Sequence, residues 1–193
     1  MKQAEQLPIL AFESQQDWQT WLDAHQSDTQ GLWLKLAKKE SGIPSLSYAE
    51  ALENALCYGW IDGQKAAFDG AYWLQKFTPR RARSVWSKVN CAKAEELIAL
   101  GRMQPAGLRQ VELARVDGRW AAAYESQSKI GIPADFQAAL DANPPALEFF
   151  GTLNSANRYA VLYRIQAAKR LQTRSARIEQ LIAMLAHHQK IHP

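Results

Sequence analysis

The chain has 193 residues, of which 47% are apolar and 22% charged, with a formal net charge of +4. This composition is typical of a globular protein with ample material for a core, and it excludes a disordered chain. No stretch reaches the roughly 18 to 20 consecutive apolar residues of a membrane-spanning helix, and residues 1–13 hold no apolar run long enough for a signal peptide. We therefore expect a cytoplasmic protein that does not insert into a membrane.

The first third of the chain predicts strands alternating with helices. Residues 8–12 read as a short strand, and residues 31–39 alternate as in a half-buried strand. The intervening helix begins at Ser14, and a second helix begins at Ser47; each serine is followed three residues later by an acid, as in a capping box. The second helix is predicted to end at Gly59.

The strongest hairpin signal is Asp69-Gly70, which joins strand-like runs at 60–68 and 71–78. This dipeptide favours a two-residue type I′ turn, because both central positions of that turn need a positive φ. Such a turn places on one face the opposed pairs Phe68 and Ala71, Ala66 and Trp73, Gln64 and Gln75, and Asp62 and Phe77. A face with these polar and aromatic side chains is typical of a pocket wall or of an ordinary edge hairpin.

Helices predominate after residue 90. Ser87 or Asn90 can cap a helix that ends at Gly101, and Pro105 suits the first turn of the next. Further helices are predicted to open at Pro133, Pro144, Ser155 and Thr173. Because strands come first and helices follow, we predict an α+β fold. Residues 1–90 would form a small antiparallel sheet with helices, and residues 91–193 a mainly helical part of the same continuous body.

Common catalytic and metal-binding patterns are missing from the sequence. There is no GxSxG, Walker A or GxGxxG motif, and we assign no catalytic residue. Cys57 and Cys91 lie far apart without a CxxC pattern, so we expect two reduced, buried thiols. His188 and His192 have the spacing of zinc ligands on a helix, but no carboxylate follows them. We therefore expect no metal and no cofactor, and a binding protein rather than an enzyme.

Basic and aromatic residues concentrate in and around residues 76–90. Six bases and no acid lie between Gly70 and Ala94. From Arg158 onward the sequence has seven bases and one acid. Arginine binds phosphate and carboxylate groups through a fork of donors, and aromatic rings stack on flat ligands. The candidate ligand-binding residues are Trp60, Asp62, Gln64, Trp73, Phe77, Arg80, Arg81, Arg83, Trp86, Ser87 and Asn90. The alternative is a solvated surface that pairs with the acidic first third of the chain.

Asp62 has two interpretations within this set. It could act as a general base, or it could anchor and orient the arginines. Nearby guanidinium groups would lower the pKa of its carboxyl, and a general base needs a pKa tuned toward neutrality. We therefore interpret Asp62 as an anchor.

Several long stretches resemble one bacterial family. They are SYAEALENALCYGWIDGQ, WLQKFTPRRARSVWSKVN, LIALGRMQPAGL, SANRYAVLYRIQAAKR and the terminal IHP. On these motifs the chain is similar to the YdeI/OmpD-associated family, also called bacteriocin-protection proteins. Leu171-Gln172 and His187-His188 depart from the family pattern. The resemblance implies a link to resistance against bacteriocins or antimicrobial peptides and to outer-membrane porin biology, but no established reaction.

The resemblance also gives a set of characteristic residues by position. They are Trp60, Asp62, Gly63, Phe77, Pro79, Arg80, Arg81, Arg83, Trp86, Ser87 and Asn90. Most of this set coincides with the residues chosen on chemical grounds.

These observations give one leading function and two alternatives. The leading hypothesis is a non-enzymatic cytoplasmic stress or bacteriocin-protection protein whose basic aromatic segment binds an anionic small molecule or an envelope-related protein. Direct capture of cationic peptides is disfavoured because like charges repel. The first alternative is a nucleic-acid-binding protein, for which affinity would fall steeply with salt. The second is an enzyme of unrecognised type that uses Asp62.

Overall fold

The structure is a computed structural model that describes residues 7–26, 28, 30–126 and 129–193. The chain divides into two compact units, each described here by itself. Unit 1 comprises the chain up to Trp86 together with Asn90–Ala123, and unit 2 comprises Ser87–Val89 with Tyr124–Pro193. The predicted α+β class is confirmed, because the sheet lies in the first half of the chain and helices dominate the second.

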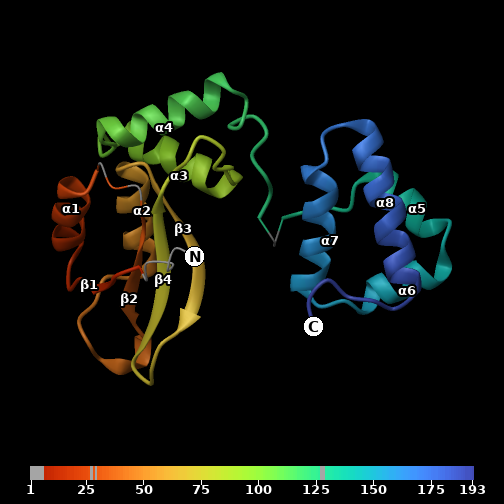
Figure 1. The fold of residues 1–193 in the computed structure, drawn as a ribbon, viewed down its shortest axis with the longest axis horizontal. Helices are drawn as coiled ribbons and strands as arrows, with labels where there is room; N and C mark the ends of the chain where they lie inside the picture. Colours follow the sequence, from red (N-terminus) through yellow and green to blue (C-terminus); the bar gives the residue numbers. More distant parts are fainter. Residues whose placement is uncertain (1–6, 27, 29, 127–128) are drawn as a thin grey trace, which may run out of the picture. The chain divides into compact units, whose positions relative to one another are not determined.

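Unit 1 contains a four-stranded sheet in the order β1-β2-β4-β3 (Figure 1). The strands are β1 (Ile9–Ala11), β2 (Leu32–Ala37), β3 (Trp60–Ala67) and β4 (Tyr72–Pro79). The pairs of β2 with β4 and of β3 with β4 are antiparallel, as the sequence predicted. β1 adds a parallel pair at the edge, because the helix after it carries the chain back before β2 begins.

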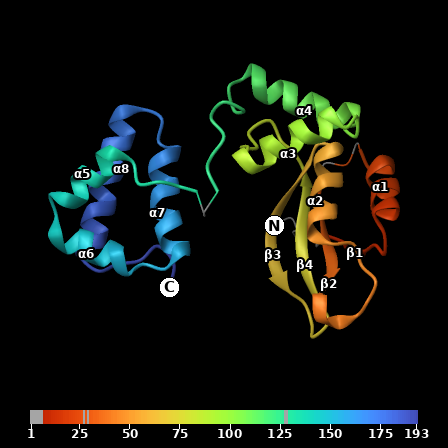
Figure 2. The same cartoon turned by 180° about the vertical axis from the view of Figure 1, so that it is seen from behind.

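One face of the sheet is covered by α1 (Gln15–Ala24) and α2 (Tyr48–Cys57), as Figure 2 shows from behind. Both helices begin where their caps were predicted: the Ser14 side chain accepts from the N–H of Asp17, and Ser47 and Glu50 form a complete capping box. The alternation of β2 is also confirmed. Its three leucines are buried under the helices, and the residues between them are half-buried. A short 3-10 helix, η1 (Lys39–Ser41), follows β2.

The helices α3 (Lys88–Ala99) and α4 (Pro105–Val116) lie beyond the end of the sheet at which β4 finishes (Figure 1). Leu97 of α3 and Val111 of α4 pack with Leu56 and Cys57 at the end of α2. Gly107 permits the close approach of α4, since a Cβ there would lie 2.2 Å from the carbonyl oxygen of Cys57. This packing places the division of the chain after α4, whereas the sequence analysis divided it at residue 90.

Unit 2 is helical and has its own core. Its helices are α5 (Ala134–Asp141), α6 (Pro144–Thr152), α7 (Ser155–Ala167) and α8 (Leu171–Ala186). Phe136 and Phe150 meet edge to face, and the apolar stripe of α8 packs beside them through Ile178, Leu181 and Leu185. Among the described residues, no helix combines the length and the apolar character needed to cross a membrane.

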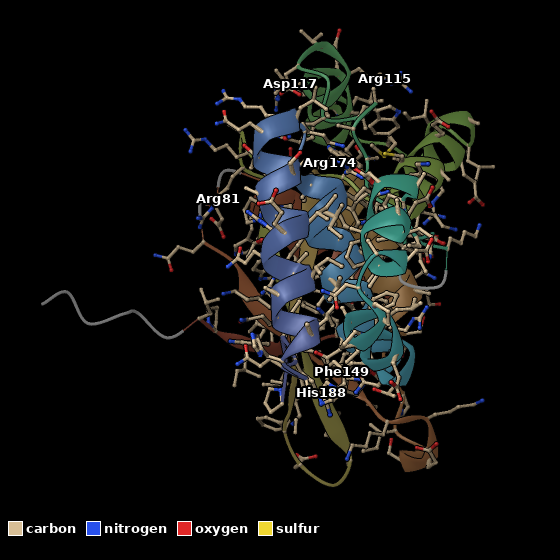
Figure 3. The ribbon with its side chains drawn as sticks, turned by 90° about the vertical axis from the view of Figure 1, so that its right-hand side faces the viewer. Arg81, Arg115, Asp117, Phe149, Arg174 and His188 are labelled. Atoms are coloured by element: carbon tan, nitrogen blue, oxygen red, sulfur yellow. The ribbon has the colours of Figure 1, made fainter. Side chains whose placement is uncertain are left out.

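The C-terminal segment of unit 2 is tied to α7 by Asn157, whose side chain is almost fully buried. Its Oδ1 accepts from the backbone N–H groups of Ile191 and His192, at 3.1 and 2.9 Å, and its Nδ2 donates to the carbonyl oxygen of His192. Nearby, the rings of Phe149 and His188 stack at 4.9 Å (Figure 3). The SANRY and IHP motifs are therefore in direct contact, through the hydrogen bonds of Asn157 to Ile191 and His192.

Candidate functional site

The hairpin that carries much of the predicted site has a longer turn than the sequence indicated. Four residues connect the end of β3 to the start of β4, and neither Asp69 nor Gly70 has a positive φ. The type I′ prediction is therefore wrong. The Asp69 carboxylate instead accepts hydrogen bonds from the backbone N–H groups of Ala71 and Tyr72, at 2.8 and 2.7 Å. This side chain satisfies the turn's donors without positive φ angles, which explains the difference.

The longer turn shifts the strand register by one residue beside it. Ala67 lies opposite Trp73 and Lys65 opposite Gln75, each one residue later on β3 than predicted. A shift of one residue turns each side chain to the other face of the sheet. Lys65, rather than Gln64, therefore shares a face with Trp73.

The predicted register returns further along the hairpin. An irregularity between Asp62 and Lys65 absorbs the shift, so that Asp62 lies opposite Phe77 as expected. The buried Gln75 supports this irregular stretch, because its side-chain amide donates to the carbonyl oxygen of Gly63 at 2.9 Å. A backbone group that leaves the strand ladder thereby keeps a hydrogen-bond partner.

Beside Trp73 lies a groove of about 610 Å³, lined mainly by lysine and by the indole. We call this feature the Trp73 groove and define it by Lys38, Lys39, Lys65 and Trp73. A second cavity, of about 420 Å³, shares Lys38, Lys39 and Trp73 and extends to Tyr48 at the start of α2. Both volumes lie in the range of small-molecule sites, roughly 300 to 1,000 Å³.

The charges around the Trp73 groove favour an anion. The Lys65 ammonium lies 4.3 Å from the centre of the Trp73 ring, and the Lys38 ammonium donates to the backbone carbonyl of Asp69. Glu40 is the one acid among the described residues that line the groove. Three lysines beside an indole can attract a negative group and contact a flat, apolar one.

Asp62 lies near the groove but does not anchor the arginines. Its Oδ2 accepts a hydrogen bond of 2.8 Å from the Tyr48 hydroxyl. Among the residues that the structure describes, Asp62 is joined to Tyr48 rather than to a guanidinium group. The anchor interpretation is corrected on this point, because the hydroxyl of α2 is its nearest partner. The use of Asp62 by an unrecognised enzyme stays a prediction.

Three of the predicted aromatic ligands are core residues. Trp60, Phe77 and Trp86 are 1%, 0% and 2% exposed. They pack against α1, α2 and α3, which leaves no ring face for a ligand. We therefore place them in the core and not in a binding site.

Arg80 is also built into the fold. Its side chain is 6% exposed, its Cζ lies 3.5 Å from the centre of the Trp86 ring, and its Nη1 donates to the carbonyl oxygen of Val85 at 3.2 Å. A guanidinium group held in this way stabilises the loop after β4. It is not presented to solvent as an anion receptor.

Arg81 and Arg83 are exposed, but they lie at the end of β4 opposite to Trp73 (Arg81 is labelled in Figure 3). At about 3.3 Å per residue, the strand separates the two ends by roughly 20 Å. Ser87 and Asn90, at the start of α3, are buried and half-buried. The exposed residues of the predicted ligand-binding set therefore do not form one site. Arg81 and Arg83 lie in the loop after β4, whereas Trp73 lies in the groove near the start of that strand.

Sequence analysis missed Lys38, Lys39 and Tyr48. The two lysines directly follow β2 and close the segment predicted as a half-buried strand, which was a usable signal. The two lysines were overlooked because charge was counted over the first third of the chain as a whole, which holds twice as many acids as bases. Tyr48 stands next to the predicted helix cap Ser47, and no motif marked it as a site residue.

The cysteines offer no reactive thiol. Cys57 and Cys91 are both free and buried, as predicted. Burial raises the pKa of each thiol to about 11, so each stays protonated near neutral pH. In the described part of the chain, no group of three or more His, Cys, Asp and Glu side chains could hold a metal ion.

Comparison with known proteins gives two family matches. Residues 129–188 match the family model described as Bacteriocin-protection, YdeI or OmpD-Associated. Residues 10–110 match a model described as a domain of unknown function, DUF8412. No curated protein and no solved structure matches the chain. The Trp73 groove thus lies in the DUF8412 range, and helices α5 to α8 lie in the other.

Proposed function

Because the chain belongs to the bacteriocin-protection, YdeI or OmpD-associated family and carries a DUF8412 domain, we propose that it is a cytoplasmic protection protein that binds a small anionic molecule in the Trp73 groove. One observation carries the proposal. Lys38 and Lys39, just after β2, and Lys65 of β3 line a cavity of about 610 Å³ together with Trp73, and the Lys65 ammonium lies over the indole.

The ligand class follows from the lining. An anionic group would pair with the lysines, and a flat or apolar group would lie against Trp73. In the adjoining cavity, the hydroxyl oxygens of Ser45 and Ser47 each accept one backbone hydrogen bond and have a second lone pair for a donor on a larger ligand. A cationic antimicrobial peptide would be repelled by the same lysines. Protection would therefore act through an anionic metabolite or envelope precursor, not through capture of the peptide.

The test is a ligand screen on the wild type and on two double variants, each of which removes two lysine charges. Thermal shift and titration calorimetry of the full chain would use nucleotides, sugar phosphates and envelope precursors. We expect Lys38→Gln/Lys65→Gln to weaken binding of the active compound class about 100-fold, since each lost charged contact is worth at least roughly 1.5 kcal/mol, or about tenfold.

The matched control is Lys35→Gln/Lys76→Gln. These lysines stand on the same sheet but on the face away from the helices, above Tyr72 and Trp33. The control loses the same charge and should retain binding. If both double variants lost the same affinity, the effect would come from net charge and not from the groove. If no compound stabilised the wild type, the anion site would be rejected.

The face that carries Lys35 and Lys76 supports nucleic-acid binding as a second candidate. The Lys35 ammonium lies 4.0 Å from the ring centre of Tyr72 and 4.8 Å from that of Phe68, and Lys76 stands over Trp33. Aromatic rings interleaved with lysines are typical of surfaces on which single-stranded bases stack. This candidate predicts binding of a single-stranded oligonucleotide that weakens steeply with salt and is lost in Lys35→Gln/Lys76→Gln but not in Lys38→Gln/Lys65→Gln.

A further inference from the structure

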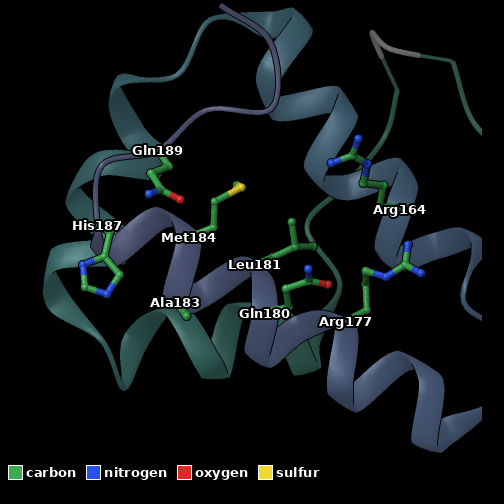
Figure 4. Close-up of a pocket in the computed structure, with 8 residues that line it drawn as sticks. All are labelled: Arg164, Arg177, Gln180, Leu181, Ala183, Met184, His187 and Gln189. Carbon is green, nitrogen blue, oxygen red and sulfur yellow. The ribbon is translucent and has the colours of Figure 1, made fainter.

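Unit 2 contains a second basic pocket, separate from the Trp73 groove. Its volume is about 560 Å³, and it is formed by α7, α8 and the segment after α8. Figure 4 shows Arg164 and Arg177 at one end and His187 and Gln189 at the other, with Met184 between. All of these residues belong to unit 2, so the pocket is complete within it.

The two arginines of this pocket carry charge that no described residue pairs with. In the described part of the chain, neither Arg164 nor Arg177 has a hydrogen bond or an ion pair. None of the lining residues described is acidic. Arg174, one turn before Arg177 on α8, shows the contrast: it pairs with Asp135 and donates to the carbonyl oxygen of Ile165.

Two guanidinium groups at the same end of the pocket, neither paired with a described residue, favour a shared anion. Each presents a fork of donors that fits the oxygens of a phosphate group, and a dianion can satisfy both forks together. A phosphate monoester offers three terminal oxygens and close to two negative charges, against two oxygens and one charge for a carboxylate. The end of the pocket at Arg164 and Arg177 therefore suits a terminal phosphate.

The rest of the lining suits an organic group attached to that phosphate. Leu181 and Met184 provide an apolar floor, and the amides of Gln180 and Gln189 add donors and acceptors at its sides. Such a mixture is typical of sites for small organic ligands.

We propose that this pocket binds a small phosphate monoester, with its phosphate held by Arg164 and Arg177 and its organic group over Leu181 and Met184. The site goes beyond the proposed function: it lies in the other unit and uses different residues. It also gives the family-matched helices of unit 2 a ligand of their own.

Part of this site is visible in the sequence. Seven bases lie from Arg158 onward, counting Arg158 itself, against a single acid. On α8, Arg177, Gln180, Met184 and His187 follow the spacing of one helix stripe, which indicates a common face. The position of Arg164 beside that stripe depends on how α7 packs against α8, which the sequence does not reveal.

The test is calorimetric titration of the full chain with phenyl phosphate, and separately with inorganic phosphate and with phenol. We expect phenyl phosphate to bind most tightly, because it fills both ends of the site. In Arg164→Gln/Arg177→Gln, its affinity should fall by at least about tenfold for each arginine removed. Lys169→Gln/Arg170→Gln, which removes equal charge from exposed residues outside the pocket, should leave the affinity unchanged.

Two further variants make the outcome decisive. Gln180→Glu keeps both arginines and the helix but introduces a carboxylate into the pocket, and it should also weaken phenyl phosphate about tenfold or more. Lys38→Gln/Lys65→Gln should have no effect, so failure of the Trp73 groove and failure of this site can be told apart. The proposal would be overturned if phenyl phosphate did not bind, or if only a single-stranded oligonucleotide bound. It would also be overturned if Arg164→Gln/Arg177→Gln and Lys169→Gln/Arg170→Gln lost the same affinity for phenyl phosphate.

Discussion

Replacement of Asn157 by alanine should destabilise unit 2 by about 3 kcal/mol, from several buried hydrogen bonds lost together. The side chain makes bonds to the backbone of Ile191 and His192 and one to Asn154, and it is 1% exposed. Without it, the segment after α8 loses its attachment to α7. We expect that segment to exchange its amide hydrogens rapidly, and the helices of unit 2 to unfold at lower urea concentration.

The stabilities of the two units can be measured separately. All seven tryptophans lie in unit 1, so their fluorescence reports that unit, whereas hydrogen exchange on α7 and α8 reports unit 2. His192→Ala is the matched control: it removes an exposed side chain but keeps the backbone groups that Asn157 binds, and it should cost less than about 0.5 kcal/mol. Equal destabilisation by the two variants would show that Asn157 does not hold the segment.

Replacement of Arg80 by alanine should destabilise unit 1 by about 3 kcal/mol, from loss of a desolvated cation–π contact and of a charged hydrogen bond. The Cζ of Arg80 lies 3.5 Å from the ring centre of Trp86, and the Val85 carbonyl would lose the Nη1 donor. Arg80→Lys should recover only part of the loss, because an ammonium group cannot stack as a plane on the indole.

Urea unfolding followed by tryptophan fluorescence measures this effect directly, because Trp86 lies against the substituted side chain. Arg81→Ala and Arg83→Ala are the matched controls, since both side chains are exposed in the same loop. Each should change stability by less than about 0.5 kcal/mol. If Arg80→Ala unfolds at the same urea concentration as these controls, Arg80 does not stabilise the core and its role as an anion receptor regains support.

The contrast among the three arginines matters for function. The resemblance and the chemistry both placed Arg80, Arg81 and Arg83 in one ligand set. A loss of ligand binding in Arg80→Ala would follow from loss of folding alone. Tests of the anion site should therefore use the exposed lysines of the Trp73 groove, whose removal leaves the core intact.

Local features were predicted well from sequence because each depends on neighbouring residues. The caps at Ser14 and Ser47 need only a side chain and the N–H groups three residues later. The burial of alternate residues in β2 follows from the period of a strand. The hairpin at Asp69-Gly70 exists, but its turn type was wrong because the Asp69 side chain competes for the same backbone donors.

The candidate site was predicted only in part. Trp73 was found, because an aromatic residue beside a hairpin turn was visible in the sequence. Gln64 was predicted to share its face, but the one-residue shift in register places Lys65 there instead. Arg80 and Trp86 were assigned to a ligand because arginine and tryptophan look the same in a sequence whether they contact a ligand or each other.

The sequence by itself determined the α+β class, the positions of most helices and strands, the two reduced thiols and the family. These depend on composition, on periodicity and on motifs within one segment. Only the tertiary structure decided that Lys38 and Lys65 line one groove with Trp73, that α3 and α4 pack against α2, and that Arg164 lines the same pocket as Arg177. Each of these outcomes depends on strand register or helix packing, which bring together residues that no local pattern connects.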